Sequence, residues 1–176
     1  MGGAEEAGVG DQLSAQSIAP ETLHQATVRL LDEARRLAVE YYRTTGKPLG
    51  VTGEVAELAS WETLGVELAD ARQPGFDGWL VRDGVRLRVQ VKGRAVTRER
   101  LYIGRCPAIK CGDKFDLCLL VLLDKTTLQP IEIWEADEDA IVARLDAPGS
   151  KSRNERRSLG ISQFKSIARR VWRAEQ

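Results

Sequence analysis

Three polar residues, Asp77, Gln90 and Lys92, interrupt a stretch of sequence that otherwise has the pattern of an ordinary β-hairpin. Carboxylate and amide oxygens are ligand types that bind divalent cations such as Mg²⁺. A lysine ammonium beside such a cation can stabilise negative charge that develops during a reaction. The three residue types are therefore candidates for cation-assisted chemistry, provided that the fold brings them together.

The register of the hairpin follows from Asp83-Gly84, a dipeptide typical of two-residue type I′ turns. With Asp83 and Gly84 as the loop, counting back along the two strands places Asp77 directly opposite Gln90. Apolar and polar residues alternate along the second strand, so Gln90 and Lys92 point to the same face. Opposed Cβ atoms lie about 4.5–5.5 Å apart, and the pattern therefore predicts convergence of the three side chains. A solvated polar face, or a longer loop with a shifted register, is the alternative interpretation.

Two acids, Glu54 and Glu57, fall on a helix predicted over Thr52–Leu64. At 100° per residue both carboxylates lie within the broad apolar arc of this helix, with Ala56 and Ser60 on the expected solvent side. An unpaired charge in an apolar arc is costly, and a metal ion or a nearby cation would offset that cost. For Glu54 the alternative is a favourable interaction with the helix dipole, and for Glu57 an arginine partner.

The order of these features resembles the PD-(D/E)XK nuclease superfamily, which has the restriction-endonuclease-like fold. An acid-bearing helix is followed by a hairpin that carries Asp77 and, thirteen residues on, the Gln-x-Lys sequence of Gln90 and Lys92. More narrowly, the segments GEVAE, GFDGW and VQVKGR are similar to small bacterial domains of that superfamily that have no assigned function. The similarity runs from the first predicted helix to the C-terminal GISQFKSIARRVW.

The resemblance implies a Mg²⁺- or Mn²⁺-dependent endonuclease or exonuclease, a hydrolase that cleaves phosphodiester bonds, with DNA as the expected substrate. It makes Asp77 the central metal ligand and puts Gln90 where Glu or Asp is usual. The backbone carbonyl of Val91 would be a neighbouring ligand. Lys92 would be the motif lysine, which orients the attacking water or stabilises charge that develops on the phosphate.

Two features depart from the pattern of the superfamily. Two residues separate Pro74 from Asp77, where proline usually comes immediately before the aspartate. Gln90 is neutral, as in a subset of members with a Gln-x-Lys motif, and gives the ion one negative charge fewer. The resemblance therefore implies that metal binding depends also on Glu54 or Glu57, the helix carboxylate that some members contribute.

Positive charge is concentrated in two segments, although 26 Lys and Arg balance 26 Asp and Glu overall. Residues 82–114 hold ten Lys and Arg against three acids, and residues 150–173 hold eight against one. Basic segments on an otherwise acidic chain indicate a local surface that faces a polyanion. The candidate contacts to a nucleic-acid backbone are Arg86, Arg88, Arg94, Arg98, Arg100, Lys110, Lys151, Arg153, Arg156 and Arg157. The alternative is solvated surface charge, for Arg86 and Arg88 above all.

Two other function classes fit the same residues. One is a catalytically inactive nuclease-fold protein that binds nucleic acid through the basic segments. The other is a protein-interaction module in which Glu57 and Lys92 form an ion pair. A homodimer is a further expectation, because cutting both strands of a duplex commonly needs two active sites, although the sequence carries no evident dimerisation motif.

The elements that must position these residues indicate one domain over residues 20–176, preceded by a disordered tail at 1–19. The predicted helices cover 20–44, 52–64, 137–145 and 162–172. The predicted strands cover 66–71, the two flanks of Asp83-Gly84, 101–103, 115–123 and 131–135. Their order predicts an α/β fold of the α+β type, with a central mixed β-sheet of about five strands flanked by helices, and the resemblance implies that this sheet is restriction-endonuclease-like.

Apolar spacing assigns faces to the first and last of these helices. The first helix is expected to bury one apolar stripe, formed by Leu23, Leu30, Ala34, Leu37 and Tyr41. Ser162 is expected to cap the last helix, whose apolar stripe is Phe164, Ile167, Ala168, Val171 and Trp172. Both stripes follow three-, four- and seven-residue spacings, which are typical of helices packed on one side.

Cys106, Cys111 and Cys118 are expected to be reduced, buried thiols, because an odd number without paired spacing forms no disulfide framework. A zinc site usually needs four ligands in two close pairs, and the sole histidine, His24, is far away in sequence. The chain lacks an apolar run near the roughly 18 residues of a membrane span, and it has no signal-peptide pattern at its start. A cytoplasmic protein without membrane association is therefore expected.

Overall fold

The computed structural model describes residues 21–69, 75–112, 114–149 and 155–175, so the tail expected at 1–19 lies outside them. The strands are β1 Glu67–Leu68, β2 Gly78–Arg82, β3 Val85–Val96, β4 Leu117–Asp124, β5 Pro130–Asp137 and β6 Arg169–Arg173. They form one sheet in chain order, in which β3 and β4 are parallel and all other neighbours are antiparallel. The predicted mixed sheet flanked by helices is confirmed, with six strands rather than about five.

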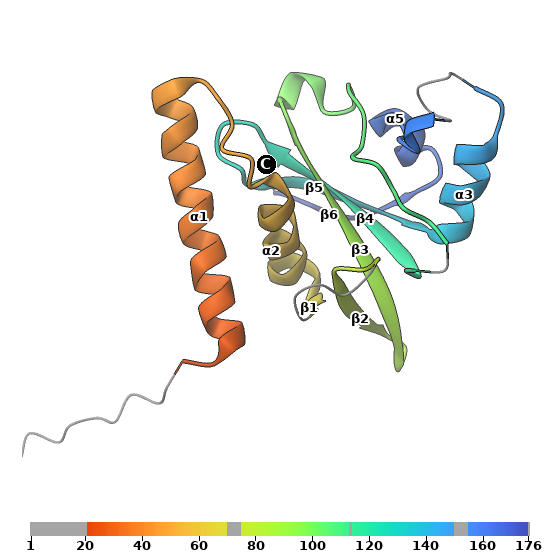
Figure 1. Cartoon of the computed structure of the whole chain (residues 1–176), viewed down its shortest axis with the longest axis horizontal. Coiled ribbons are helices and arrows are strands. Elements are labelled where there is room, and N and C mark those ends of the chain that lie inside the picture. The colour runs from red at the N-terminus through yellow and green to blue at the C-terminus, as the bar shows by residue number, and fades with distance from the viewer. Residues whose placement is uncertain (1–20, 70–74, 113, 150–154, 176) are drawn as a thin grey trace, which may run out of the picture.

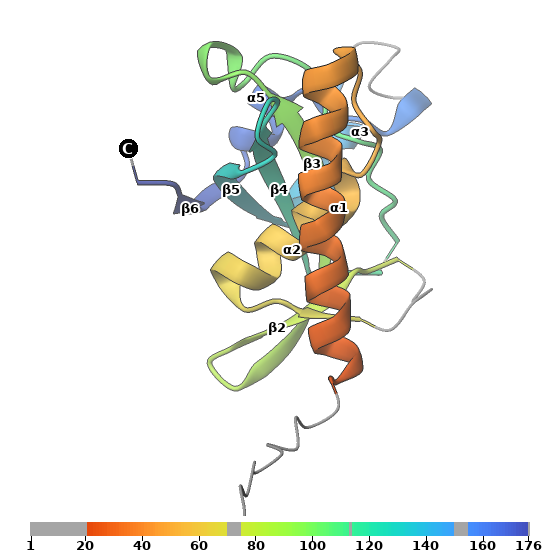
Figure 2. The ribbon, with the colours of Figure 1, turned by 90° about the vertical axis from the view of Figure 1, so that its left-hand side faces the viewer.

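Helices cover both faces of this sheet (Figures 1 and 2). The helices are α1 Leu23–Thr45, α2 Thr52–Leu64, α3 Glu138–Asp146 and α5 Ile161–Lys165. Leu119 and Val121 of β4 pack toward α2 and α1, whereas Leu120 and Leu122 pack toward α3 and α5. β4 is thus buried on both faces, as its continuous apolar run predicts. Within the described ranges, no helix is long and apolar enough to cross a membrane.

The helix α1 begins where Thr22 caps it, with the side chains of Thr22 and Gln25 forming a capping box. The stripe predicted to be buried is wrong, because Leu23, Leu30 and Leu37 are 82%, 54% and 59% exposed. The helix packs instead through a second stripe, about a third of a turn away at 100° per residue. That stripe consists of Val28, Leu31, Ala38, Val39 and Tyr42.

The helix α2 has the predicted bounds and ends at Gly65, whose φ of 71° is left-handed. Ala56 and Ser60, predicted to face solvent, are buried, because α2 packs between α1 and β3 and has little free surface. Gly93 of β3 permits this packing, since a Cβ there would collide with the carbonyl oxygen of Thr52 and the Cβ of Ala56. The close approach brings α2 directly against β3.

The predicted C-terminal helix at 162–172 is wrong in its second half. The helix α5 ends at Lys165, and the chain continues as β6, which pairs with β5. The pairing is reinforced by the buried Glu135 of β5, which accepts a hydrogen bond of 2.8 Å from Arg169 of β6. Gly160 rather than Ser162 caps α5. Tertiary partners on β5 thus override a local pattern that fits a helix equally well.

Two other predicted strands differ from the structure. The strand predicted at 66–71 is limited to Glu67–Leu68 among the described residues. The segment 101–103 is not a strand, because the chain turns there after the short 3₁₀ helix Arg98–Arg100. Both segments are short and carry no sustained alternation, so their pairing depends on neighbours elsewhere in the chain.

Candidate functional site

The hairpin that carries the candidate residues has the predicted register at every pair of β2 and β3. Asp83 and Gly84 have φ angles of 51° and 76°, as a type I′ turn requires. The main-chain N–H of Asp77 donates to the carbonyl of Val89 at 2.8 Å. The ladder therefore continues one residue beyond β2, and Asp77 lies opposite Gln90.

The Asp77 carboxylate occupies the edge of β3 at the point where pairing with β2 stops. Its Oδ2 accepts a hydrogen bond of 2.7 Å from the N–H of Val91. The N–H and C=O of one strand residue point to the same side of the strand, so the Val91 carbonyl faces this edge as well. A carboxylate and a main-chain carbonyl thus meet where the resemblance implies two metal ligands.

The side chain of Gln90 contributes an acceptor without a partner. Gln90 is 4% exposed, and its Nε2 donates to the carbonyl of Gly75 at 3.0 Å. This hydrogen bond fixes the orientation of the amide, because the opposite orientation would set two oxygens against each other. Its Oε1 is buried and has no hydrogen-bond partner among the described residues, a state that costs roughly 1–3 kcal/mol. A cation is one group that would satisfy this oxygen.

Glu57 lies half-buried on the face of α2 that approaches this edge. Burial, together with the charges of Asp77 and Glu54, raises the pKa of Glu57 to about 7 against the opposing charge of Lys92. Burial likewise raises the pKa of Cys118; the charge of Lys92 lowers this pKa and the charge of Asp77 raises it. Asp77, Lys92 and Glu57 therefore lie within electrostatic reach of one another. Glu54, in contrast to its predicted place in the apolar arc, is exposed.

Lys92 is half-buried, and among the described residues no carboxylate lies within ion-pair distance of it. The ion pair with Glu57 that an interaction module would use is therefore not formed. Gln90 and Lys92 pair with Cys118 and Leu120 of β4, and being two residues apart on β3 they lie on one face of the sheet, as the alternation predicts. The lysine ammonium lowers the pKa of Glu57 from a distance and makes no direct ion pair with its carboxylate.

The candidate ligand set is unusual in composition. No three His, Cys, Asp or Glu side chains of the described segments are placed to hold a metal ion. The set at the β3 edge instead combines the Asp77 carboxylate, the Gln90 amide oxygen and the Val91 carbonyl, with Glu57 nearby. All are oxygen ligands, the type that Mg²⁺ prefers. The cysteines are free; Cys106 and Cys118 are buried as predicted, whereas Cys111 is only half-buried.

The candidate nucleic-acid contacts divide into two groups. Several are held in ion pairs: Arg86 with Glu67 at 3.6 Å, Arg88 with Asp116 at 2.9 Å, Arg98 with Asp124 at 3.3 Å and Arg157 with Asp146 at 2.7 Å. Arg94, Arg100, Lys110 and Arg156 are exposed. Lys151 and Arg153 lie outside the described residues. The exposed group is the better candidate for contacts to phosphates.

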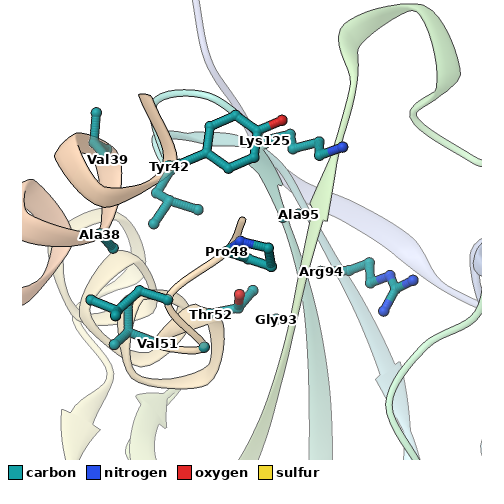
Figure 3. A pocket seen from close by; sticks show the side chains of 13 residues that line it. Ala38, Val39, Tyr42, Pro48, Val51, Thr52, Gly93, Arg94, Ala95 and Lys125 are labelled. Carbon is teal, nitrogen blue, oxygen red and sulfur yellow. The ribbon is translucent and has the colours of Figure 1, made fainter. Parts of the chain in front are cut away.

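A cavity of about 280 Å³ lies beside the site, between α1, the start of α2 and β3 (Figure 3). Its lining is mostly apolar and includes Tyr42 and Val51, with Lys125 at its rim. Figure 3 shows the Arg94 side chain on the side of β3 away from Tyr42 and Val51. The cavity lining does not include the candidate residues Asp77, Gln90 and Lys92, so the cavity is not the candidate site.

Comparison with known proteins adds no assignment. No protein-family model matches the chain, and no curated protein matches its sequence. The candidate site is therefore interpreted from its own residues and their geometry.

The raised pKa of Glu57 predicts a pH-dependent effect of Glu57→Gln on the stability of the metal-free protein. A carboxyl whose folded-state pKa is near 7 rather than 4.5 costs stability as pH rises between those values. Glutamine cannot ionise, so the variant avoids this loss. Its free energy of unfolding relative to the wild type should increase between those pH values and stay constant at higher pH. We expect about 1–2 kcal/mol at pH 8 after solvent screening, measured by urea unfolding in EDTA. An equal effect at pH 5 and pH 8 would contradict the shifted pKa.

Proposed function

We propose that this chain is a divalent-metal-dependent nuclease of the PD-(D/E)XK type that hydrolyses phosphodiester bonds in DNA. The observation that carries the proposal is the buried Oε1 of Gln90, which has no partner in the described chain and belongs to the residue opposite Asp77 in the hairpin. A buried acceptor left unpaired beside a carboxylate fits a cation site better than a purely structural role, which would supply a donor.

The candidate residues would have two roles, metal binding and stabilisation of charge on the phosphate. Asp77, Gln90 and the Val91 carbonyl would hold Mg²⁺ or Mn²⁺, and Glu57 would add the charge that neutral Gln90 does not supply. An ion held there would polarise a phosphodiester and lower the pKa of a water molecule. Lys92 lies beside this group without an ion-pair partner in the described chain, so its ammonium is available to a phosphate oxygen. It would stabilise the charge that develops there in the transition state.

The substrate class follows from the cations on the same face of the sheet. Arg94 comes two residues after Lys92 on β3 and is exposed, which places it to hold a phosphate next to the one that reacts. Arg100, Lys110 and Arg156 are exposed in the two basic segments. Such side chains contact the charged phosphates of DNA and not its bases, so DNA binding should weaken as the salt concentration rises.

The test is Mn²⁺ binding and DNA cleavage by the intact protein and by Asp77→Asn. Asparagine keeps an acceptor for the Val91 N–H, so the fold should be retained while the central charge is lost. We expect calorimetric Mn²⁺ binding to weaken at least tenfold and Mn²⁺-dependent cleavage of a mixed DNA panel to disappear. Asp83→Asn is the matched control. Asn is favoured in the same left-handed turn conformation, and position 83 lies at the end of the hairpin that is far from Asp77.

The second candidate function is nucleic-acid binding without cleavage. It is favoured by the neutrality of Gln90 and by the Val91 N–H that already occupies one Asp77 oxygen. In that case Mn²⁺ binding would be absent from both the wild type and Asp77→Asn, while DNA would still bind in a salt-dependent manner. Mn²⁺ binding that is lost in Asp77→Asn excludes a purely structural role for the carboxylate.

A further inference from the structure

The outer surface of α1 carries an apolar seam whose four large side chains are exposed in the described chain. Its residues are Leu23, Thr27, Leu30, Ala34, Leu37 and Tyr41. Four of them, Leu23, Leu30, Leu37 and Tyr41, are among the eight large hydrophobic residues that the described surface exposes. In Figures 1 and 2, α1 stands at the outside of the molecule, with α2 between it and the strands.

The spacing of the seam specifies the kind of partner. Its residues follow one another at intervals of four, three, four, three and four, an average period of about 3.5 residues. This is the a/d period of a coiled coil, in which each side chain fits a hole formed by a facing helix. The inner stripe of α1 already contacts its own domain, so the outer seam is a second, separate packing surface. A helix is the partner that this period fits.

The sizes of the seam residues match those of a second copy of α1 that runs in the opposite direction. In the antiparallel register centred on residue 32, Leu30 of each copy faces Ala34 of the other. Leu37 faces Thr27 in the same register, and Tyr41 faces Leu23. Two of the three layers thus pair a large side chain with a small one, as interdigitated helices require. A parallel pair would instead set Ala34 against Ala34 and leave a gap.

We propose that this protein forms a homodimer through antiparallel pairing of α1 with α1. Charge along the border of the seam alternates, with Arg29, Glu33, Arg36, Glu40 and Arg43 in turn. The border therefore has no block of one sign that would select an acidic or basic partner over a second copy. This inference does not depend on the proposed nuclease activity, although two copies would place two candidate sites in one particle.

The dimer should be weak and dependent on concentration. A helix of 23 residues is about 35 Å long, and helix diameters are about 10 Å. The contact is therefore at or below the low end of stable protein interfaces. We expect sedimentation velocity of the full chain, from about 1 to 200 μM, to show a monomer–dimer equilibrium with a dissociation constant in the micromolar range.

The decisive variant pair replaces exposed apolar residues by glutamate at two places. Leu30→Glu with Leu37→Glu should raise the dissociation constant at least tenfold and give a monomer through most of the concentration range. Val81→Glu with Val85→Glu is the matched control, because these hairpin residues are 60% and 57% exposed and lie away from α1. A wild type that stays monomeric at 200 μM overturns the proposal, as does a dimer that both pairs of substitutions leave unchanged.

Spin labels test the direction of the helices without altering the seam leucines. In the antiparallel register, labels at Thr44→Cys in the two copies lie about 36 Å apart along the helix axis, at 1.5 Å per residue. In a parallel pair they would lie about 10 Å apart, the distance between neighbouring helix axes. The labelled protein carries Cys111→Ser, since Cys111 is only half-buried. A short distance overturns antiparallel pairing even if the protein is a dimer.

Discussion

Replacement of Lys92 by methionine is expected to lower the rate of Mn²⁺-dependent DNA cleavage by about 10²–10³-fold, the usual cost of removing one group that stabilises transition-state charge. Lys92 is half-buried beside Asp77 and Glu57 and has no ion-pair partner in the described chain. Methionine keeps the length of the side chain and its apolar contacts, so the loss isolates the ammonium. Single-turnover cleavage at saturating protein measures it directly.

Metal binding separates this role from a purely structural one. The affinity for Mn²⁺ should remain within a few-fold of the wild type, because Lys92 is not a ligand and its removal relieves repulsion of the cation. Lys47→Met is the matched control, because Lys47 lies in an exposed loop between α1 and α2 and should retain full activity. Retained cleavage in Lys92→Met would remove the motif lysine from the mechanism and favour binding without catalysis.

The hairpin could be predicted from the sequence because its determinants are local. Asp83 and Gly84 fix a turn that few other dipeptides adopt, and the turn alone sets which residues of β2 and β3 oppose each other. The opposition of Asp77 and Gln90 follows by counting, without any knowledge of the remaining chain. The bounds of α2 are local for the same reason, since Gly65 ends it in a left-handed conformation.

The faces of the helices could not be predicted, because they depend on partners distant in sequence. The helix α1 has two apolar stripes, and periodicity finds both without indicating which one meets the domain. The small Ala38 marks the inner stripe, but a single alanine in a helix is no distinctive signal. The strand β6 was missed for a related reason: Val171 and Trp172 suit a helix stripe or an edge strand, and the buried glutamates of β5 decide between them.

The site itself shows the same division between local and distant determinants. The sequence predicts Glu54 and Glu57 alike as candidate ligands, whereas in the structure Glu57 is half-buried and Glu54, one turn earlier, is exposed. Helical phase alone does not separate them, because the difference lies in where β3 passes the helix. The pairing of Arg88 with Asp116 was likewise hidden, since the two residues are 28 positions apart and meet only where β3 and β4 lie side by side.

Gln90→Glu is expected to strengthen Mg²⁺ binding at least tenfold while destabilising the metal-free protein. A glutamate at this position adds a negative charge beside Asp77 and Glu57, and it removes the amide donor that now binds the Gly75 carbonyl. Without a cation, the added charge repels its neighbours in a buried place. With a cation, the same charge becomes a stronger ligand than the neutral amide.

Thermal unfolding with and without metal distinguishes these two effects. In EDTA at pH 8, the melting temperature of Gln90→Glu should fall below that of the wild type by several degrees. Addition of Mg²⁺ should raise the melting temperature of Gln90→Glu by more than that of the wild type. Binding to the folded state adds stability in proportion to the logarithm of the affinity. Gln129→Glu, at an exposed turn position, should respond to neither condition. If Gln90→Glu stays equally destabilised in Mg²⁺, the unpaired Oε1 is not a metal ligand, because a cation at this edge would neutralise the added carboxylate.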